Sequence, residues 1–159
     1  MNNRALKTCI FYCSNHLQAG QFASLGPGPG HDELKTIGLP CSGKVDIPYL
    51  IKAFETGADA VVLVRCKTNE CRHFEGNLRA HKRADAVSAL LEEIGSDGRR
   101  ITVLECPEGG ASEVIGQISR FVDRVRNLAE RSARGAGTAC PRRISTPVGA
   151  SNAKESTAA

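Results

Sequence analysis

Two cysteines, Cys66 and Cys71, stand five residues apart in the stretch VRCKTNECRHFEGN (64–77), directly after the apolar run ADAVVLV (58–64). The thiolate form of cysteine is a nucleophile and a soft metal ligand, so such a pair suits metal binding or thiol chemistry. The chain contains seven cysteines in 159 residues. In a reducing compartment this number favours a metal or redox site over structural disulfides.

Hydrophobic runs alternate with segments of helical period along the chain. Uninterrupted apolar runs predict buried strands, and the amphipathic segments between them predict helices. The strands are expected at 8–13, 34–41, 58–66 and 101–106, and the helices at 47–56, 76–94 and 112–131, with a shorter helix near 16–25. This order predicts an α/β protein with a single Rossmann-like or flavodoxin-like domain, in which helices flank a four-stranded, mostly parallel sheet.

Local signals mark where these helices begin and which faces they bury. Asp46 is expected to cap the helix at 47–56, with Pro48 in its first turn and Gly57 just past its end. The apolar faces of the two later helices are expected to be Val87, Leu90, Leu91 and Ile94, and then Val114, Ile115, Ile118, Val122, Val125 and Leu128. Beyond Ser132 the composition turns to small and polar residues, which predicts one domain at 1–131 and a disordered tail at 132–159.

Four of the cysteines are predicted to meet at one edge of the sheet. Cys13, Cys41 and Cys66 end the first three predicted strands, and Cys71 lies in the loop after the third. Ligands of open parallel sheets gather outside the carboxyl ends of the strands. Four thiolates there suit an iron–sulfur cluster or a tetrahedral zinc ion. A thiol enzyme with one cysteine activated by His16 or His73 is a third possibility, but it does not explain why several cysteines share an edge.

The remaining cysteines have simpler interpretations. Cys9 lies inside the first strand and is expected to be buried, Cys106 ends the last strand, and Cys140 falls in the predicted tail. His16 forms a C-x-x-H pair with Cys13, which fits either a ligand or a surface histidine. His73 and the segment Ser42, Gly43 and Lys44 are expected to tune a bound group. In that segment the backbone N–H groups of the tight glycine turn can bond to sulfurs, and the charge of Lys44 would favour a reduced centre.

Composition and charge exclude several other classes of protein. Of the net charge of +4, three charges come from the segment after residue 131, and no basic stripe with interleaved aromatic residues is present, so a nucleic-acid partner is not expected. No apolar run is long enough to span a bilayer, and the first residues lack the pattern of a signal peptide. We therefore expect a cytoplasmic protein without a membrane partner.

The segment CSGKVDIPYLIKAFETGADAVVLVRCKTNECRHFEGNLRAHKR (41–83) resembles the delta subunit family of methyl-viologen-reducing (F420-non-reducing) hydrogenases. That family shows a CSG-[RK]-VD segment, a helix ending in A-F-x-x-GADGV, and then C-H-x-G-D-C-H-Y-x-x-GN-x-x-A-x-x-R. The resemblance extends over roughly 7–130. This chain departs from the pattern at His16, where the family usually has a further cysteine, at Lys67 in place of a histidine, and at Arg72, His73 and Phe74.

The resemblance implies a 2Fe–2S protein that transfers electrons and is not itself a catalyst. It implies that the cluster is held by Cys13, Cys41, Cys66 and Cys71. It also implies two protein partners, namely an electron-donating oxidoreductase and a flavoprotein of the heterodisulfide reductase A type. Four cations in or just after the strand-end loops are expected to face a partner: Lys44, Lys67, Arg72 and Arg79.

Overall fold

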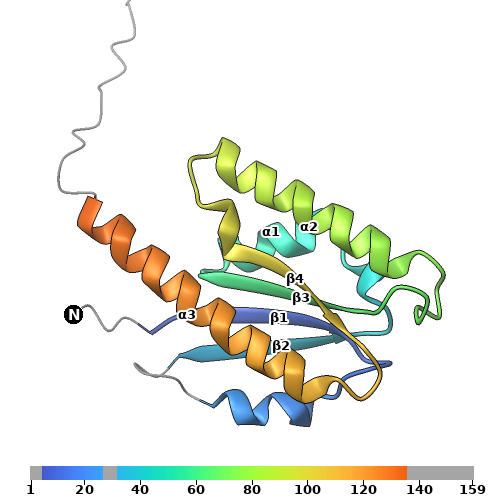
Figure 1. Ribbon diagram of the computed structural model, residues 1–159. Coiled ribbons are helices and arrows are strands. Elements are labelled where there is room, and N and C mark those ends of the chain that lie inside the picture. The colour runs from blue at the N-terminus through green and yellow to red at the C-terminus, as the bar shows by residue number, and fades with distance from the viewer. Residues whose placement is uncertain (1–4, 27–31, 136–159) are drawn as a thin grey trace, which may run out of the picture.

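The computed structural model describes residues 5–26 and 32–135, and their core is a four-stranded sheet (Figure 1). The strands are β1 (Lys7–Cys13), β2 (Glu33–Leu39), β3 (Ala60–Cys66) and β4 (Ile101–Cys106). All the pairings are parallel, and the order is β2-β1-β3-β4. This is the order of the first four strands of flavodoxin-like sheets, so the predicted fold class is confirmed.

Helices cover both faces of the sheet, as its apolar strands require. Helices α1 (Ile47–Glu55) and α2 (Gly76–Glu93) pack on one face, and α3 (Ala111–Gly135) packs on the other together with the short 3₁₀ helix η1 (Ala19–Leu25) (Figure 1). Two further 3₁₀ turns are η2 (Ser42–Lys44) and η3 (Gly98–Arg100). The central strand β3 is buried at every position except Arg65, which explains its continuous apolar sequence. No described helix is long and apolar enough to cross a membrane.

Three elements begin or end at other residues than predicted. Strand β2 ends at Leu39, because the next residue, Pro40, has no N–H to donate, so Cys41 lies two residues past the strand. The segment expected to be a helix near 16–25 is the 3₁₀ helix η1, which begins only at Ala19. Helix α3 runs on to Gly135, beyond its predicted end at 131. Residues 136–159, which hold Cys140 and most of the predicted tail, lie outside the described residues.

The buried face of α2 also differs from the prediction. Val87 and Leu91 are buried as expected, but Leu90 is 40% exposed and Ile94 is 77% exposed. The rest of the buried face consists of small residues, chiefly Ala80 and Ala84. In α3 the predicted stripe is buried or half-buried, and Phe121 belongs to it as well.

One arginine of α2 fixes the turn that carries Cys41. The guanidinium group of Arg83 donates to the carbonyl oxygens of Gly43 (2.6 Å) and Val45 (2.8 Å) and pairs with the Asp46 carboxylate at 2.9 Å. Asp46 is the N-cap residue of α1, as predicted, but its side chain accepts no capping hydrogen bond from the helix backbone. Arg83 therefore ties three residues of the 43–46 segment to the side of α2.

We expect Arg83→Gln to destabilise the fold by about 1–3 kcal/mol, because two backbone carbonyls would lose a charged donor. Arg79→Gln, one turn earlier on the same helix, is the matched control. The Arg79 side chain is 67% exposed, and its guanidinium lies 3.9 Å from the Glu75 carboxylate. Replacing it should therefore lower the free energy of unfolding by about 0.5 kcal/mol or less. Urea unfolding of the two variants measures the difference. Equal losses of unfolding free energy would show that Arg83 does not hold the turn.

Candidate metal centre at the strand ends

The four candidate cysteines lie together at the carboxyl edge of the sheet. Cys13 and Cys66 are the last residues of the neighbouring central strands β1 and β3, and Cys41 stands directly before the turn η2. These three side chains are at most 3% exposed, whereas Cys71, in the loop between β3 and α2, is half-buried. The convergence expected from a parallel sheet is therefore present in the structure.

The thiols are close enough to change one another's protonation. Cys71 hydrogen-bonds to both Cys41 and Cys66, and the charge of Cys13 acts on the same two thiols. Burial is the largest effect on both, and together with these neighbours it raises the pKa of Cys66 to about 12 and also raises the pKa of Cys41. Four sulfurs in this space cannot all carry charge unless a cation is present to balance them.

The pKa of Cys71 is lowered, unlike the pKa values of Cys41 and Cys66, because backbone N–H groups donate hydrogen bonds to its sulfur. Burial alone would raise its pKa, but the N–H groups of His73, Asn77 and Gly76, with a hydrogen bond from the Cys66 thiol, lower it overall. The surroundings of Cys71 thus favour its thiolate form. A single backbone N–H, from Gly43, supports the sulfur of Cys41 in the same manner.

Two glycines let the surrounding backbone approach the sulfurs. A Cβ atom on Gly76 would lie 2.4 Å from Cys41 Sγ and 3.2 Å from Cys71 Sγ. A Cβ atom on Gly43 would lie 2.6 Å from the Cα atom of Gly76. The start of α2 and the turn η2 are therefore in direct backbone contact beside the cysteines, and only residues without a side chain fit at these two positions.

Two asparagines hold the loops on either side of the thiols. The Asn77 amide, 2% exposed, donates to the carbonyl of Lys67 at 3.1 Å and, more weakly, to that of Cys66 at 3.5 Å. The Asn15 amide donates to the carbonyl of Pro40 at 3.0 Å and lies 3.7 Å from Cys13 Sγ. The sequence alone predicted no role for either residue. The Gly-Asn pair at the start of α2 could have pointed to Asn77 as a residue that holds the loop before the helix.

Of the predicted tuning residues, Gly43 contributes as expected, because its backbone N–H bonds to the Cys41 sulfur. His73 and Lys44 are exposed, and His73 acts on Cys71 through its backbone N–H. Five buried side-chain polar atoms of the described residues have no hydrogen-bond partner, and they include the hydroxyl of Ser42, the residue after Cys41, and Nδ1 of His16, three residues after Cys13. Such unpartnered atoms fit a site that holds a further group, since buried polar atoms are normally paired.

The other two cysteines of the described residues, Cys9 and Cys106, differ in their relation to the four candidate ligands. Cys9 is buried inside β1, as predicted, in the core beneath α1 and α2. Cys106 ends β4 opposite Cys66, and its thiol donates to the carbonyl of Pro107 at 3.4 Å. Burial, then the charges of Glu70 and Cys13, raises its pKa. Cys106 is therefore a fifth cysteine at the same edge, but its thiol is bonded to its own loop.

The donor set consists of thiols, which suit an iron–sulfur group or a zinc ion. In residues 5–26 and 32–135, no three His, Cys, Asp or Glu side chains are grouped so that they could hold one metal ion. A tetrahedral zinc needs four ligands around one point, whereas a 2Fe–2S cluster distributes four thiolates over two irons.

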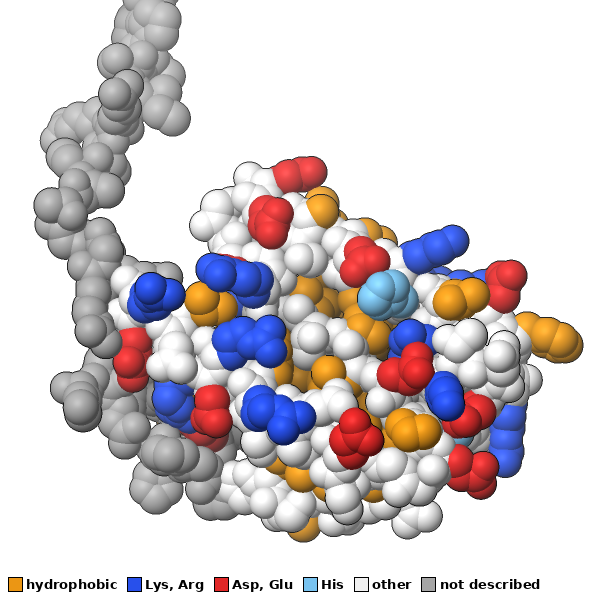
Figure 2. All heavy atoms as spheres, viewed as in Figure 1, with side chains coloured by type: hydrophobic (Ala, Val, Ile, Leu, Met, Phe, Trp, Pro, Cys, Tyr) orange, Lys and Arg blue, Asp and Glu red, His pale blue; other side chains and the backbone are white. Residues whose placement is uncertain are grey.

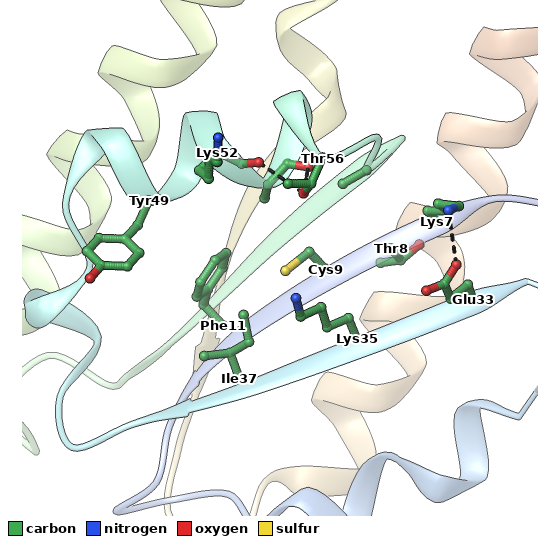
Figure 3. A pocket seen from close by; sticks show the side chains of 12 residues that line it. Lys7, Thr8, Cys9, Phe11, Glu33, Lys35, Ile37, Tyr49, Lys52 and Thr56 are labelled. Carbon is green, nitrogen blue, oxygen red and sulfur yellow. Dashed lines mark hydrogen bonds and ion pairs between the residues drawn. The ribbon is translucent and has the colours of Figure 1, made fainter.

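Two cavities lie away from these cysteines. One, of about 370 Å³, opens between α1 and the strands β1 and β2, with Cys9, Phe11 and Ile37 on its floor and Lys35 reaching over it (Figure 3). The other, of about 210 Å³, lies between α3 and the first residues of β1 and β2. None of the four candidate cysteines lines either cavity, so neither provides room for a substrate beside the sulfurs.

Comparison with known proteins shows which family the chain matches. The family described as methyl-viologen-reducing hydrogenase, delta subunit, matches residues 9–129. The chain is 37% identical over 95 residues, 60% of its length, to the iron-sulfur subunit of the vhu F420-non-reducing hydrogenase from Methanocaldococcus jannaschii, of which it covers 71%. It is 26% identical over 110 residues, 69% of its length, to the protein of the same name from Methanopyrus kandleri, of which it covers 83%.

A second kind of relative is much longer. The chain is 27% identical over 95 residues to the A component of the ferredoxin:CoB-CoM heterodisulfide reductase of Methanosarcina mazei, and the match covers 60% of the chain but only 12% of that relative. Because the family match spans well over half of the sequence, the protein belongs to the delta subunit family of methyl-viologen-reducing hydrogenases.

Proposed function

We propose that the protein is an electron-transfer subunit that carries one 2Fe–2S cluster on Cys13, Cys41, Cys66 and Cys71. The observation that carries the proposal is the convergence of four thiols at one sheet edge, three of them at most 3% exposed and the fourth half-buried. The names of the relatives as iron-sulfur subunits support it. When bound, such a cluster supplies one-electron oxidation and reduction.

The residues of the chain set the conditions for this chemistry. The backbone N–H groups of His73, Gly76 and Asn77 stabilise negative charge on the Cys71 sulfur. Such hydrogen bonds favour the more negative, reduced form of a thiolate-bound centre. The burial of Cys13, Cys41 and Cys66 excludes water from the other sulfurs. Buried thiolates with hydrogen-bonded sulfurs suit a centre that relays electrons between proteins.

We further propose two partners, an electron-donating oxidoreductase and a flavoprotein of the heterodisulfide reductase A type. The relatives named as parts of hydrogenases support the first partner. The Methanosarcina mazei relative supports the second, since a segment similar to this chain is there part of the same polypeptide as a heterodisulfide reductase A component. Two modules that are joined in one protein commonly work in contact when they occur on separate chains.

The first prediction concerns the ligands. After anaerobic purification the protein should be brown-red and contain about two irons and two sulfides per chain, as a 2Fe–2S cluster requires. Cys41→Ala, Cys66→Ala and Cys71→Ala should each lose most of the visible absorbance and the EPR signal of the reduced protein. Cys9→Ala and Cys140→Ala should keep both, because neither residue is a proposed ligand.

Two results would contradict this assignment. A colourless protein with one zinc per chain would replace the cluster by a structural zinc ion at the same thiols. Full iron content in the Cys66→Ala protein would remove Cys66 from the ligand set.

The second prediction concerns the glycine at the start of α2. Gly76→Ala places a methyl group 2.4 Å from Cys41 Sγ, which should lower the iron content and destabilise the protein by about 1–3 kcal/mol through overpacking. Gly116→Ala in α3 is the control, because a Cβ there meets nothing within 4 Å. It should keep full iron and gain about 0.5–1 kcal/mol of helix stability. Iron analysis and thermal unfolding of the two variants measure these effects. Unchanged iron content in Gly76→Ala would show that the cluster does not need the close approach of the helix start to the sulfurs.

A further inference from the structure

The loop between β3 and α2, residues 67–75, presents a phenylalanine to solvent beside the cysteines. Phe74 is 93% exposed, the highest value among the exposed large hydrophobic side chains of the described residues. Its backbone has a φ of 54°, in the left-handed region, which a bulky side chain rarely adopts. An aromatic residue that is both strained and exposed has no evident value for folding.

The hydrogen bonds that the backbone donates to the Cys71 sulfur explain the left-handed conformation of Phe74. The N–H groups of His73, Gly76 and Asn77 all point at this sulfur, so the chain has to curl around it between residues 73 and 77. Phe74 takes the left-handed conformation within this curl, and Gly76 cannot turn outward because it contacts Gly43. The arrangement of the metal centre thus holds the ring of Phe74 out in solvent.

The surroundings of Phe74 have the composition of a docking surface. Leu78, four residues further on, is 46% exposed. Lys67 and Arg72 are exposed, and neither forms an ion pair within the described part of the chain. Figure 2 shows hydrophobic, cationic and acidic side chains mixed at the end of the molecule where this loop lies. We call these four residues, Lys67, Arg72, Phe74 and Leu78, the Phe74 face.

We propose that the Phe74 face docks onto the flavoprotein partner, with the Phe74 ring in an apolar pocket of that partner and acidic side chains opposite Lys67 and Arg72. This inference rests on the proposed function and specifies the surface used. Aromatic residues are frequent anchors of protein interfaces, and charges around them direct association. Since Phe74 is three residues from Cys71, docking here brings the partner next to the sulfurs.

Two alternatives fit the surface less well. A second copy of this chain in a symmetric dimer would cover the loop beside the sulfurs and so block an electron donor or acceptor from this edge. The other strongly exposed hydrophobic side chains, Tyr49 and Ile94, lie on α1 and directly after the carboxyl end of α2. Neither belongs to the cysteine loop.

The test is binding of the iron-loaded full chain to a heterodisulfide reductase A-type flavoprotein from the same source organism. Phe74→Asn removes the ring but retains a residue that tolerates the left-handed conformation, so thermal stability should be unchanged or higher. We expect its Kd to rise about tenfold or more, as for an interface anchor. Ile94→Asn, which changes another exposed apolar residue next to the same helix, should alter the Kd by less than about twofold.

The charged residues are tested separately. The double variant Lys67→Glu/Arg72→Glu should associate more slowly and lose the salt dependence of the wild-type rate. Lys82→Glu, an exposed lysine of α2, should change the association rate little. The visible spectrum and EPR signal should be unchanged in all these variants.

The outcomes separate this proposal from the proposed function. If the wild-type protein holds the cluster but does not bind the flavoprotein, or if Phe74→Asn binds it equally well, the docking proposal is wrong and the cluster assignment stands. If Phe74→Asn loses the cluster, the ring is a structural part of the centre and the docking proposal is also wrong. A wild-type protein without iron contradicts the proposed function itself.

Discussion

The Cys71 sulfur accepts three backbone N–H groups, from His73, Gly76 and Asn77, and lies against the thiols of Cys41 and Cys66. Much of the local architecture follows from this crowding of donors and sulfurs. The start of α2 has to come close enough for its N–H groups to reach the sulfur, which requires glycine at position 76. The turn after Cys41 has to meet that helix start, which requires glycine at position 43.

The parallel sheet supplies the rest of this arrangement. Strands β1 and β3 are hydrogen-bonded neighbours, so Cys13 and Cys66 reach the same edge without any special loop. Cys41 has no such constraint because it lies beyond β2, and its turn is held by Arg83 of α2 instead. The centre therefore depends on strand pairing for two cysteines and on α2 for the other two.

The sequence was sufficient for those features that depend on local pattern. The buried run before Cys66 and the helical periods around it predicted the sheet, and the parallel order brought the strand-end cysteines together as expected. The buried face of α2 was mispredicted, because large apolar residues such as Leu90 and Ile94 suggested it, whereas close packing against the sheet uses Ala80 and Ala84.

Contacts between distant segments were harder to foresee. Arg83 bonds to backbone carbonyls some forty positions earlier, and Asn77 bonds to the backbone of the preceding loop. Backbone carbonyls carry no sequence signature, so a polar residue that bonds to them looks like any solvated side chain. The exposure of Phe74 is similar, since an apolar residue in a short loop is usually expected to cover a core.

The same loop closes the centre and forms the Phe74 face, so the two proposed roles are energetically linked. The N–H groups that hold the Cys71 sulfur also hold the left-handed turn at Phe74. A group bound to the four sulfurs fixes the loop, and a fixed loop has less conformational entropy to lose when a partner binds. Coupling between two binding sites is reciprocal. A partner that binds Phe74 would therefore favour the ordered conformation of the loop, and this conformation would in turn favour binding of the proposed cluster to the four sulfurs. An electron carrier built in this way would present its docking surface in full order only when it holds the centre that makes docking useful.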